Sequence, residues 1–262
     1  MKKFELTAEF VTNVFGKKLF RIKALVAFGD VEKGELGGFI EKEDNLSHLG
    51  NAWVFGDARV FGDARVSGDA CVSGNAQVYG DARVSGDAWV YGDARVFGDA
   101  RVFGDACVSG NAWVYGNARV FGNARVFGDA WVFGDARVFG DARVFGYARV
   151  YGNACVSGNA QVYGDARVSG DACVSGNAQV YGDADFAVVT GFGRCFRATT
   201  FFRCKDKILR VQCGCFYGDL AQFREIVKKT HGGSKYANEY LAIADLMELH
   251  FSDEEENQEA NE

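Results

Sequence analysis

Arginine recurs at a fixed interval along this chain, and charge at fixed spacing can bind anions. The interval is the same from each arginine to the next, and an acidic or amide residue stands two places before each of them. The positions are Arg65, Arg83, Arg101, Arg119 and Arg137, preceded by Asp63, Asp81, Asp99, Asn117 and Asp135. Stacked at about 4.8 Å, each adjacent pair of guanidinium groups would repel by about 1 kcal/mol even in water. Three interpretations stay open: a solvent-exposed lattice of alternating charge that keeps the molecule soluble and blocks edge association, a rigid comb for an acidic partner or phosphates, or accidental amplification of the repeat.

Aromatic residues recur with the same interval. They stand at Phe61, Tyr79, Phe97, Tyr115, Phe133 and Tyr151. If these rings point outward, they form a contiguous apolar strip of the kind that marks an interface, and we expect a homodimer seam there. Self-stacking that stiffens the molecule and binding of a ligand are the alternatives. Trp113 and Trp131, which are separated by the same interval, should stack.

Thiols and a histidine gather near the C-terminus, at Cys195, Cys204, Cys213, Cys215 and His231. A structural zinc site uses four ligands in tight pairs, whereas this chain offers one C-x-C pair and otherwise nine-residue intervals. A cysteine–histidine nucleophile would need a third group to orient the base, and none is identifiable. We therefore expect structural thiols, with no metal, no cofactor and no catalytic residue.

The arginines and the aromatic residues are positioned by a six-residue repeat. The unit Gly-[Asp/Asn]-Ala-x-Val-[Phe/Tyr/Ser] runs through 23 consecutive hexads over residues 50–187. In an extended Ala-x-Val segment, alanine and valine point to one side and x to the other, while Gly-Asp and Gly-Asn favour tight turns. Three hexads, the interval between successive arginines, would close one triangular coil, so the repeats predict a solenoid of about 7–8 coils. Cys155 and Cys173 would then lie on adjacent coils.

The repeats carry a family resemblance. Hexads such as Gly110-Asn111-Ala112-Trp113-Val114 resemble the hexapeptide-repeat left-handed parallel β-helix superfamily (trimeric LpxA-like), and most closely its YdcK-like branch. The segments 19–25, 28–31 and 36–41 are similar to the start of bacterial and prophage-borne members. The segment from 199–203 through 213–216, followed by Lys235-Tyr236, is similar to a C-terminal module of phage-borne relatives. The resemblance implies a mainly β, single-stranded left-handed parallel β-helix. For activity it implies only an acyltransferase label assigned by analogy of fold.

The two ends depart from the repeat. We expect residues 1–49 to cap the solenoid, with His48 at a valine-equivalent place as a hydrogen-bonding cap residue. Residues 188–250 should form a small α+β module, with strands over 186–190, 197–203 and 208–212 and helices over 220–229 and 236–249. The acidic residues 251–262 should be a disordered tail.

Composition narrows the function. The net charge is −6, and the repeat region holds 11 basic against 15 acidic residues, so nothing indicates sequence-specific nucleic-acid binding. No apolar run is long enough for a membrane helix, and the eight cysteines without an export signal suggest a reduced cytoplasm. The family resemblance implies that this is the cytoplasm of a bacterial host cell. The repeats contain no His, Lys or Glu and no loop insertion, which leaves a transferase without a general base or a walled pocket.

A non-enzymatic interaction protein fits these observations best. A rigid surface of regularly spaced charges can dock with little loss of entropy. The resemblance to phage-borne relatives implies a host protein as the partner, for example a CRISPR or other nucleic-acid-guided defence effector, which the chain would bind and inhibit. An acyltransferase that uses an acyl-coenzyme A donor, and a structural component of a virion, are the alternatives.

Overall fold

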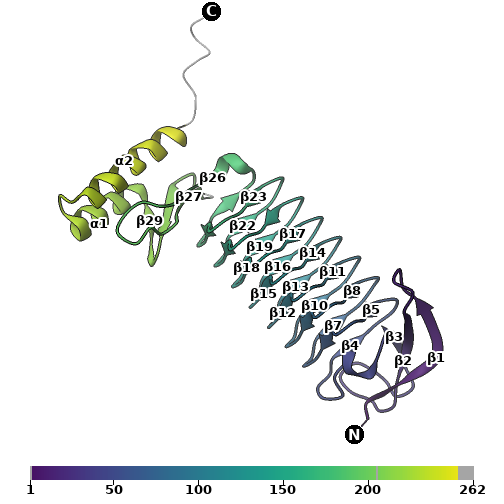
Figure 1. Ribbon diagram of the computed structural model, residues 1–262. Helices are drawn as coiled ribbons and strands as arrows, with labels where there is room; N and C mark the ends of the chain where they lie inside the picture. The colour runs from purple at the N-terminus through teal and green to yellow at the C-terminus, as the bar shows by residue number, and fades with distance from the viewer. Residues whose placement is uncertain (1, 205, 253–262) are drawn as a thin grey trace, which may run out of the picture.

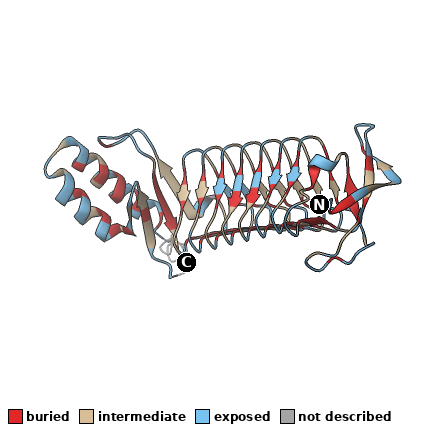
Figure 2. Ribbon diagram, turned by 90° about the horizontal axis from the view of Figure 1, so that it is seen from below, coloured by how far each residue is buried: buried red, intermediate tan, exposed pale blue. Residues whose placement is uncertain are grey.

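Alanine and valine of the hexads over residues 50–181 turn inward and build a narrow core. The computed structural model describes residues 2–204 and 206–252, and within them each hexad from 50 to 181 forms a short strand followed by a turn. The last predicted hexad, 182–187, instead forms a 3-10 helix at Asp183–Asp185 and the start of the C-terminal sheet. In one hexad, Ala100 and Val102 are fully buried while Arg101 between them is exposed. Figure 1 shows the resulting rod of stacked coils, and Figure 2 shows that buried residues recur along it from coil to coil. The predicted solenoid is confirmed.

The strands stack into three parallel sheets, which form three faces of the rod. The arginine face contains β6 (Arg65–Val66), β9 (Arg83–Val84), β12 (Arg101–Phe103), β15 (Arg119–Phe121), β18 (Arg137–Val138), β21 (Cys155–Val156) and β24 (Cys173–Val174). The hairpin face contains β5 (Arg59–Val60), β8 (Gln77–Val78), β11 (Arg95–Val96), β14 (Trp113–Val114), β17 (Trp131–Val132), β20 (Arg149–Val150) and β23 (Arg167–Val168). The third face contains β4 (Trp53–Val54), β7 (Cys71–Val72), β10 (Trp89–Val90), β13 (Cys107–Val108), β16 (Arg125–Val126), β19 (Arg143–Val144), β22 (Gln161–Val162) and β25 (Gln179–Val180).

Backbone hydrogen bonds tie each coil to the next, so that every residue lies beside its equivalent three hexads later. The Arg83 amide donates to the Ala100 carbonyl at 2.9 Å, and the Ser85 amide donates to the Val102 carbonyl at 3.0 Å. On this face arginine therefore lies beside arginine and valine beside valine. This register turns a sequence period into columns of equivalent side chains.

The glycine of the repeat makes the corner between two faces. Gly98 has a φ of 68°, in the left-handed region that glycine adopts without strain. A Cβ at this position would lie 3.1 Å from the backbone nitrogen of Gly116 on the next coil. Both the conformation and the close approach of neighbouring corners therefore require glycine.

The N-terminal cap is a β-hairpin that extends the hairpin face. Strands β1 (Phe4–Thr12) and β2 (Lys18–Ala24) pair antiparallel, and β3 (Leu36–Ile40) joins β2 to β5. A short 3-10 helix follows at Glu43–Asn45, where the buried Asn45 amide donates to the carbonyls of Gly62 and Ala64 at 3.0 and 2.8 Å. Lys3 Nζ likewise donates to the Ala52 carbonyl at 2.8 Å. The cap thus satisfies the open carbonyls of the first coil.

The register of the first coil differs from the expected one. Ile40 pairs with Val60 and Leu46 pairs with Val66, an offset longer by two positions than that between the regular coils. Leu46, 2% exposed, therefore occupies the valine place that the repeat phase assigns to His48. Two extra residues before β4 restore the regular phase, and His48 lies in that insertion. Its predicted role as a hydrogen-bonding cap residue is confirmed, because its Nδ1 accepts from the Lys3 amide at 3.2 Å.

The C-terminal module begins with an antiparallel sheet, β26 (Phe186–Val189), β27 (Thr199–Arg203), β28 (Leu209–Cys213) and β29 (Phe216–Asp219). Strand β27 closes the end of the rod: Phe202 packs into the rod core, and Phe201 packs under the helices. Helices α1 (Leu220–His231) and α2 (Lys235–His250) cover that second core, with Asp219 and Ser234 as their N-caps.

Two details of this end were not expected. Strand β29 was not predicted, and β27 starts at Thr199 instead of Arg197 because the preceding loop adopts a positive φ of 50° at Phe196. Most of the predicted tail over 251–262 lies outside the described residues, from 253 onward; Phe251 is described and packs in the module, 9% exposed. Among the described residues, no helix combines the length and apolar character needed to cross a membrane.

Candidate functional site

The five predicted arginines form one straight column on the arginine face. Strand pairing places each directly beside the next, and all five are exposed. Across residues 2–204 and 206–252, no ion pair joins any of these guanidinium groups to a carboxylate. The column therefore presents positive charges that the described part of the chain leaves unpaired.

Two other columns flank the arginines. Asp63, Asp81, Asp99 and Asp135 stand exposed at the turn before the strands, with Asn117 between the last two. Asn117 separates Asp99 from Asp135 in this column, and its side-chain amide donates to the Asp135 carboxylate at 3.0 Å. On the other side Phe103, Phe121 and Phe139 stack with centroids 4.9 and 4.8 Å apart. The arginine face therefore carries an acidic column, the arginine column and an aromatic column, in that order from one edge to the other.

Two arginines of the hairpin face, Arg95 and Arg149, behave differently because each lies against a tryptophan ring. The Trp113 and Trp131 rings stack at 5.1 Å, which confirms that pair. The guanidinium of Arg95 lies 5.0 Å from the Trp113 ring, and that of Arg149 lies 4.9 Å from the Trp131 ring. These contacts are cation–π interactions. The arginine face differs in its length of five consecutive arginines, whereas the hairpin face has one adjacent pair, Arg149 and Arg167.

The aromatic column from Phe61 to Tyr151 stacks ring on ring. Consecutive centroids are 4.8 to 4.9 Å apart, and the ring planes are within 3° of parallel. Phe61 is only 5% exposed, since Leu19 and Phe39 of the cap pack on it. The rings thus cover one another's faces, as the self-stacking interpretation expects, and a dimer seam would have to use the ring edges from Tyr79 onward.

At the C-terminal end of the arginine face, two thiols replace arginine. Cys155 and Cys173 are paired on adjacent strands, as their spacing predicts. A hydrogen bond with the Cys155 thiol lowers the pKa of Cys173. The Cys173 amide donates to the Thr200 hydroxyl at 2.9 Å, so the column ends where β27 docks.

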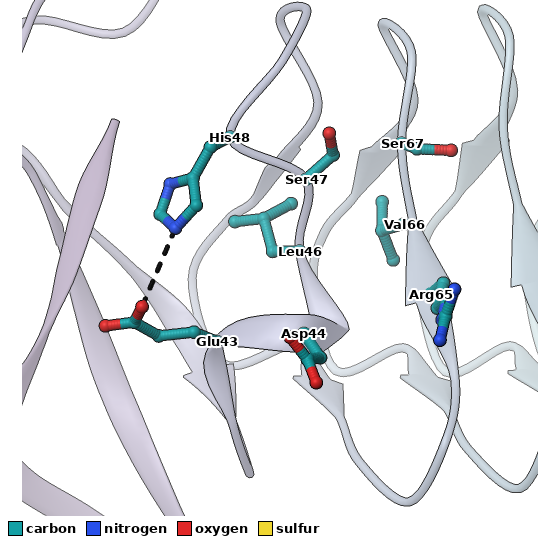
Figure 3. Close-up of a pocket in the computed structure, with 8 residues that line it drawn as sticks. All are labelled: Glu43, Asp44, Leu46, Ser47, His48, Arg65, Val66 and Ser67. Carbon is teal, nitrogen blue, oxygen red and sulfur yellow. Dashed lines mark ion pairs between the residues drawn. The ribbon is translucent and has the colours of Figure 1, made fainter. Parts of the chain in front are cut away.

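A hollow of about 500 Å³ lies at the opposite end of the arginine face, beside the first arginine (Figure 3). His48 points across it toward Glu43, with Nε2 3.7 Å from the carboxylate, and Arg65 lies on the far side. The imidazole also stacks on Phe4 at 4.4 Å. Because Nδ1 accepts from the Lys3 amide and Nε2 faces Glu43, both ring nitrogens are engaged by the protein itself.

The C-terminal thiols fall into two groups. Cys195, Cys213, Cys215 and His231 line one cavity of about 260 Å³ between the sheet and the helices. The Thr199 hydroxyl donates to Cys213 Sγ at 3.2 Å. Cys204 lies apart from them, 7% exposed at the end of the rod core. In the part of the chain that the structure describes, no three His, Cys, Asp or Glu side chains form a group that could hold a metal ion.

Lys3 is the titratable residue that the repeat pattern did not reveal. It is 3% exposed, and burial lowers its pKa to about 8 although the nearby Asp69 carboxylate opposes this shift. Its Nζ lies 4.6 Å from the Phe28 ring. No spacing in the sequence marks it, because its burial depends on how the cap closes over the first coil.

The repeats match one known family. The family described as YdcK Beta solenoid repeat matches residues 58–74, 76–92, 100–116, 112–127, 118–134, 148–164 and 160–176. These matches cover less than half of the chain, and all of them lie within the rod. No curated protein matches the chain. The chain therefore carries a YdcK-like β-solenoid.

Proposed function

We propose that this chain is a non-enzymatic interaction protein whose arginine face binds an acidic surface of a partner protein. The observation that carries the proposal is the column of five exposed, in-register arginines that no carboxylate among the described residues pairs with. Fold alone carries no function, so the proposal rests on this surface.

Electrostatics favour a partner on this face. Adjacent charges about 4.8 Å apart repel by about 1 kcal/mol in water, and the column contains four such adjacent pairs. The coil-to-coil hydrogen bonds hold the backbone in place despite that repulsion. Carboxylates of a partner would relieve it, and the face would lose little entropy because the rod already fixes the positions of the arginines.

The flanking columns favour a protein over a nucleic acid. A phosphate backbone laid along the arginines would also lie beside Asp63, Asp81 and Asp99, which are exposed. On the other edge, the stacked rings of Phe103 and Phe121 offer their rims and not their faces, so bases could not stack on them. A protein surface can place carboxylates over the arginines and apolar side chains over the phenylalanines.

The histidine nearest the arginine face is a poor general base. A base that activates an acceptor needs a free nitrogen within hydrogen-bond reach of that acceptor. In His48, the backbone of Lys3 uses one nitrogen and Glu43 faces the other. This geometry supports a cap role and favours the interaction protein over an acyltransferase.

The proposal extends to a biological setting. The resemblance of both ends of the chain to prophage- and phage-borne proteins supports a phage-type protein acting in the cytoplasm of a bacterial host. Its partner would be a host protein, such as a nucleic-acid-guided defence effector, that the rod occupies and inhibits. A homodimer that joins the column from Tyr79 to Tyr151 is part of the same proposal.

Site-specific photo-cross-linking in bacterial cells tests the proposed face. Benzoylphenylalanine replaces Phe121, which lies beside Arg119 on the arginine face, and in a second protein it replaces Phe145, which belongs to the third face's aromatic column. We expect one acidic protein to cross-link from position 121 and not from position 145.

A matched variant links that adduct to charge. Arg83→Gln, Arg101→Gln and Arg119→Gln together should abolish the adduct, because they remove three of the five charges that bind the partner. The rod should keep its fold, since glutamine already occupies this position of the repeat at Gln77 and Gln161. An adduct that persists in this triple variant, or the absence of any adduct from position 121, would contradict the proposal.

A further inference from the structure

The side-chain columns of the third face are interrupted at two coils, at Cys71 and Ser73 and again at Cys107 and Ser109, and the second interruption is the one described here. At the last position of the hexad, which holds Phe, Tyr or Ser, successive coils carry Tyr91, Ser109 and Phe127, so a serine lies between two residues with rings. At the x position between alanine and valine, whose side chain points outward, the same coils carry Trp89, Cys107 and Arg125, on β10, β13 and β16 (Figure 1). Two small side chains on one coil therefore lie between large ones on the coils above and below.

The interruption is a hollow in the surface. Its volume is about 460 Å³, and it is lined by these six residues together with Asp105. Ser109, 6% exposed, forms its floor. Trp89 is 54% exposed and Tyr91 is 41% exposed, whereas the rings of the continuous column beginning at Phe127 stack at 4.8 and 5.0 Å. Exposed tryptophan and tyrosine beside a pocket are the side chains that anchor protein interfaces.

The height of the hollow suits one aromatic ring. Two coils span about 9.6 Å, which leaves about 4.8 Å on each side of a ring inserted between Tyr91 and Phe127. That is the spacing at which the rod stacks its own rings. In the neighbouring column, the same guest would lie between the Trp89 indole and the Arg125 guanidinium, which can contact its edge or face.

The charges around the hollow select the kind of guest. Asp105 lines it, and Asp87 and Asp93, on the turns before and after β10, are exposed. Carboxylates on both edges of the face repel the phosphates of a nucleotide and attract Lys or Arg. Arg125 is one positive charge against these three acidic residues. An aromatic side chain with basic neighbours therefore matches this surface better than a nucleobase does.

We propose that the hollow at Cys107 and Ser109 is a binding slot for one aromatic side chain of a protein segment that carries lysine or arginine next to that side chain. The guest ring lies over Ser109, between the rings of Tyr91 and Phe127, and completes the aromatic column. The slot is on a different face from the arginine column and makes no use of it. It goes beyond the proposed function by giving the rod a second, oppositely charged binding surface.

The test follows the Trp89 indole N–H resonance of the full chain by NMR during titration with short peptides. The probe is acetyl-Lys-Tyr-Lys-amide, and the comparisons are acetyl-Lys-Leu-Lys-amide, acetyl-Glu-Tyr-Glu-amide and adenosine monophosphate. We expect a saturable shift with the probe. Binding of each comparison should be weaker by about fivefold or more, since stacking on two rings and the flanking charges each contribute about 1 kcal/mol.

The repeat itself supplies the blocking variant. Ser109→Phe places a ring where neighbouring coils already hold one, so it should fill the slot, keep the fold and leave the melting midpoint at or above that of the unmodified chain. The probe should then bind at least about tenfold more weakly. Ser73→Phe is the matched control: it adds the same ring at the other interruption of the column, between Phe55 and Tyr91, and leaves the slot at Ser109 open, so it should bind the probe like the unmodified chain.

Several results would overturn the slot or its guest. They are the absence of a saturable shift, equal binding of the Glu-Tyr-Glu peptide, tighter binding of adenosine monophosphate, or unchanged probe binding by a folded Ser109→Phe variant. A second copy could also supply a ring, because Phe196 is 71% exposed between Arg194 and Arg197. A concentration-dependent Trp89 shift without peptide that Phe196→Ser removes would reassign the slot to self-association. The arginine-face cross-link is unaffected by any of these outcomes, so the two proposals fail separately.

Discussion

Replacing the central arginine of the arginine face by glutamine should stabilise the rod. Arg101 lies between Arg83 and Arg119 in strict register, so Arg101→Gln removes two repulsive contacts. At about 4.8 Å each contact costs about 0.9 kcal/mol in water, which sets an upper limit of about 2 kcal/mol. Attraction to the exposed Asp81 and Asp99 offsets part of this. We therefore expect the free energy of unfolding to rise by about 1 kcal/mol at low salt.

Salt and position supply the controls. The Debye length falls from about 30 Å at 0.01 M salt to about 3 Å at 1 M, so the gain should disappear across that range. Arg59→Gln is the matched variant, because Arg59 lies between Phe39 and Gln77 and has no arginine neighbour in its column. Urea unfolding at both salt concentrations measures the effect. A loss of stability in Arg101→Gln at low salt, or an equal gain in Arg59→Gln, would refute the electrostatic reasoning.

Three further predictions concern the core, the corners and the cap. Ala118→Leu should overpack the interior, where Ala118 is fully buried, and lower the free energy of unfolding by about 1–3 kcal/mol; an unchanged urea midpoint would count against inward-facing alanines. Gly98→Ala should cost at least about 1–2 kcal/mol, because its φ is 68° and a Cβ would meet Gly116; Asp99→Ala, next to it, serves as the control. The pKa of Lys3 is lowered to about 8 in the folded chain, so between pH 8 and about 10.4 the unfolded chain binds more protons than the folded chain. The free energy of unfolding, relative to that of Lys3→Met, should therefore increase over that range by at most about 3 kcal/mol. A difference that does not depend on pH would exclude the lowered pKa.

The period of the sequence was sufficient to predict the rod. Because strands pair at an offset of three hexads, counting in steps of one coil places Arg101 beside Arg119 and Trp113 beside Trp131, as the structure has them. Counting along the remaining column would also have revealed the run Tyr91, Ser109 and Phe127, and with it the slot. The rod is predictable because each residue's neighbours are set by one repeated hydrogen-bonding pattern.

The ends were less predictable because no period constrains them. The first coil holds two extra residues, so Leu46 and not His48 fills the valine place, and only the packing of the cap decides this. Whether a ring in a column shows its face or its edge also depends on rotamers that the sequence does not state. The burial of Lys3 and the meeting of Cys195, Cys213 and His231 at one cavity depend likewise on tertiary packing.

The affinity of the cross-linked partner for the arginine face tests the central claim most directly. Calorimetric titration should compare the unmodified chain with the triple variant Arg83→Gln, Arg101→Gln and Arg119→Gln at 0.05 M and 0.5 M salt. Loss of three charge contacts of about 1 kcal/mol each predicts a Kd about 100-fold higher for the variant at low salt, and a much smaller difference at high salt. Equal affinity of the two proteins at 0.05 M salt would contradict a function carried by the arginine column.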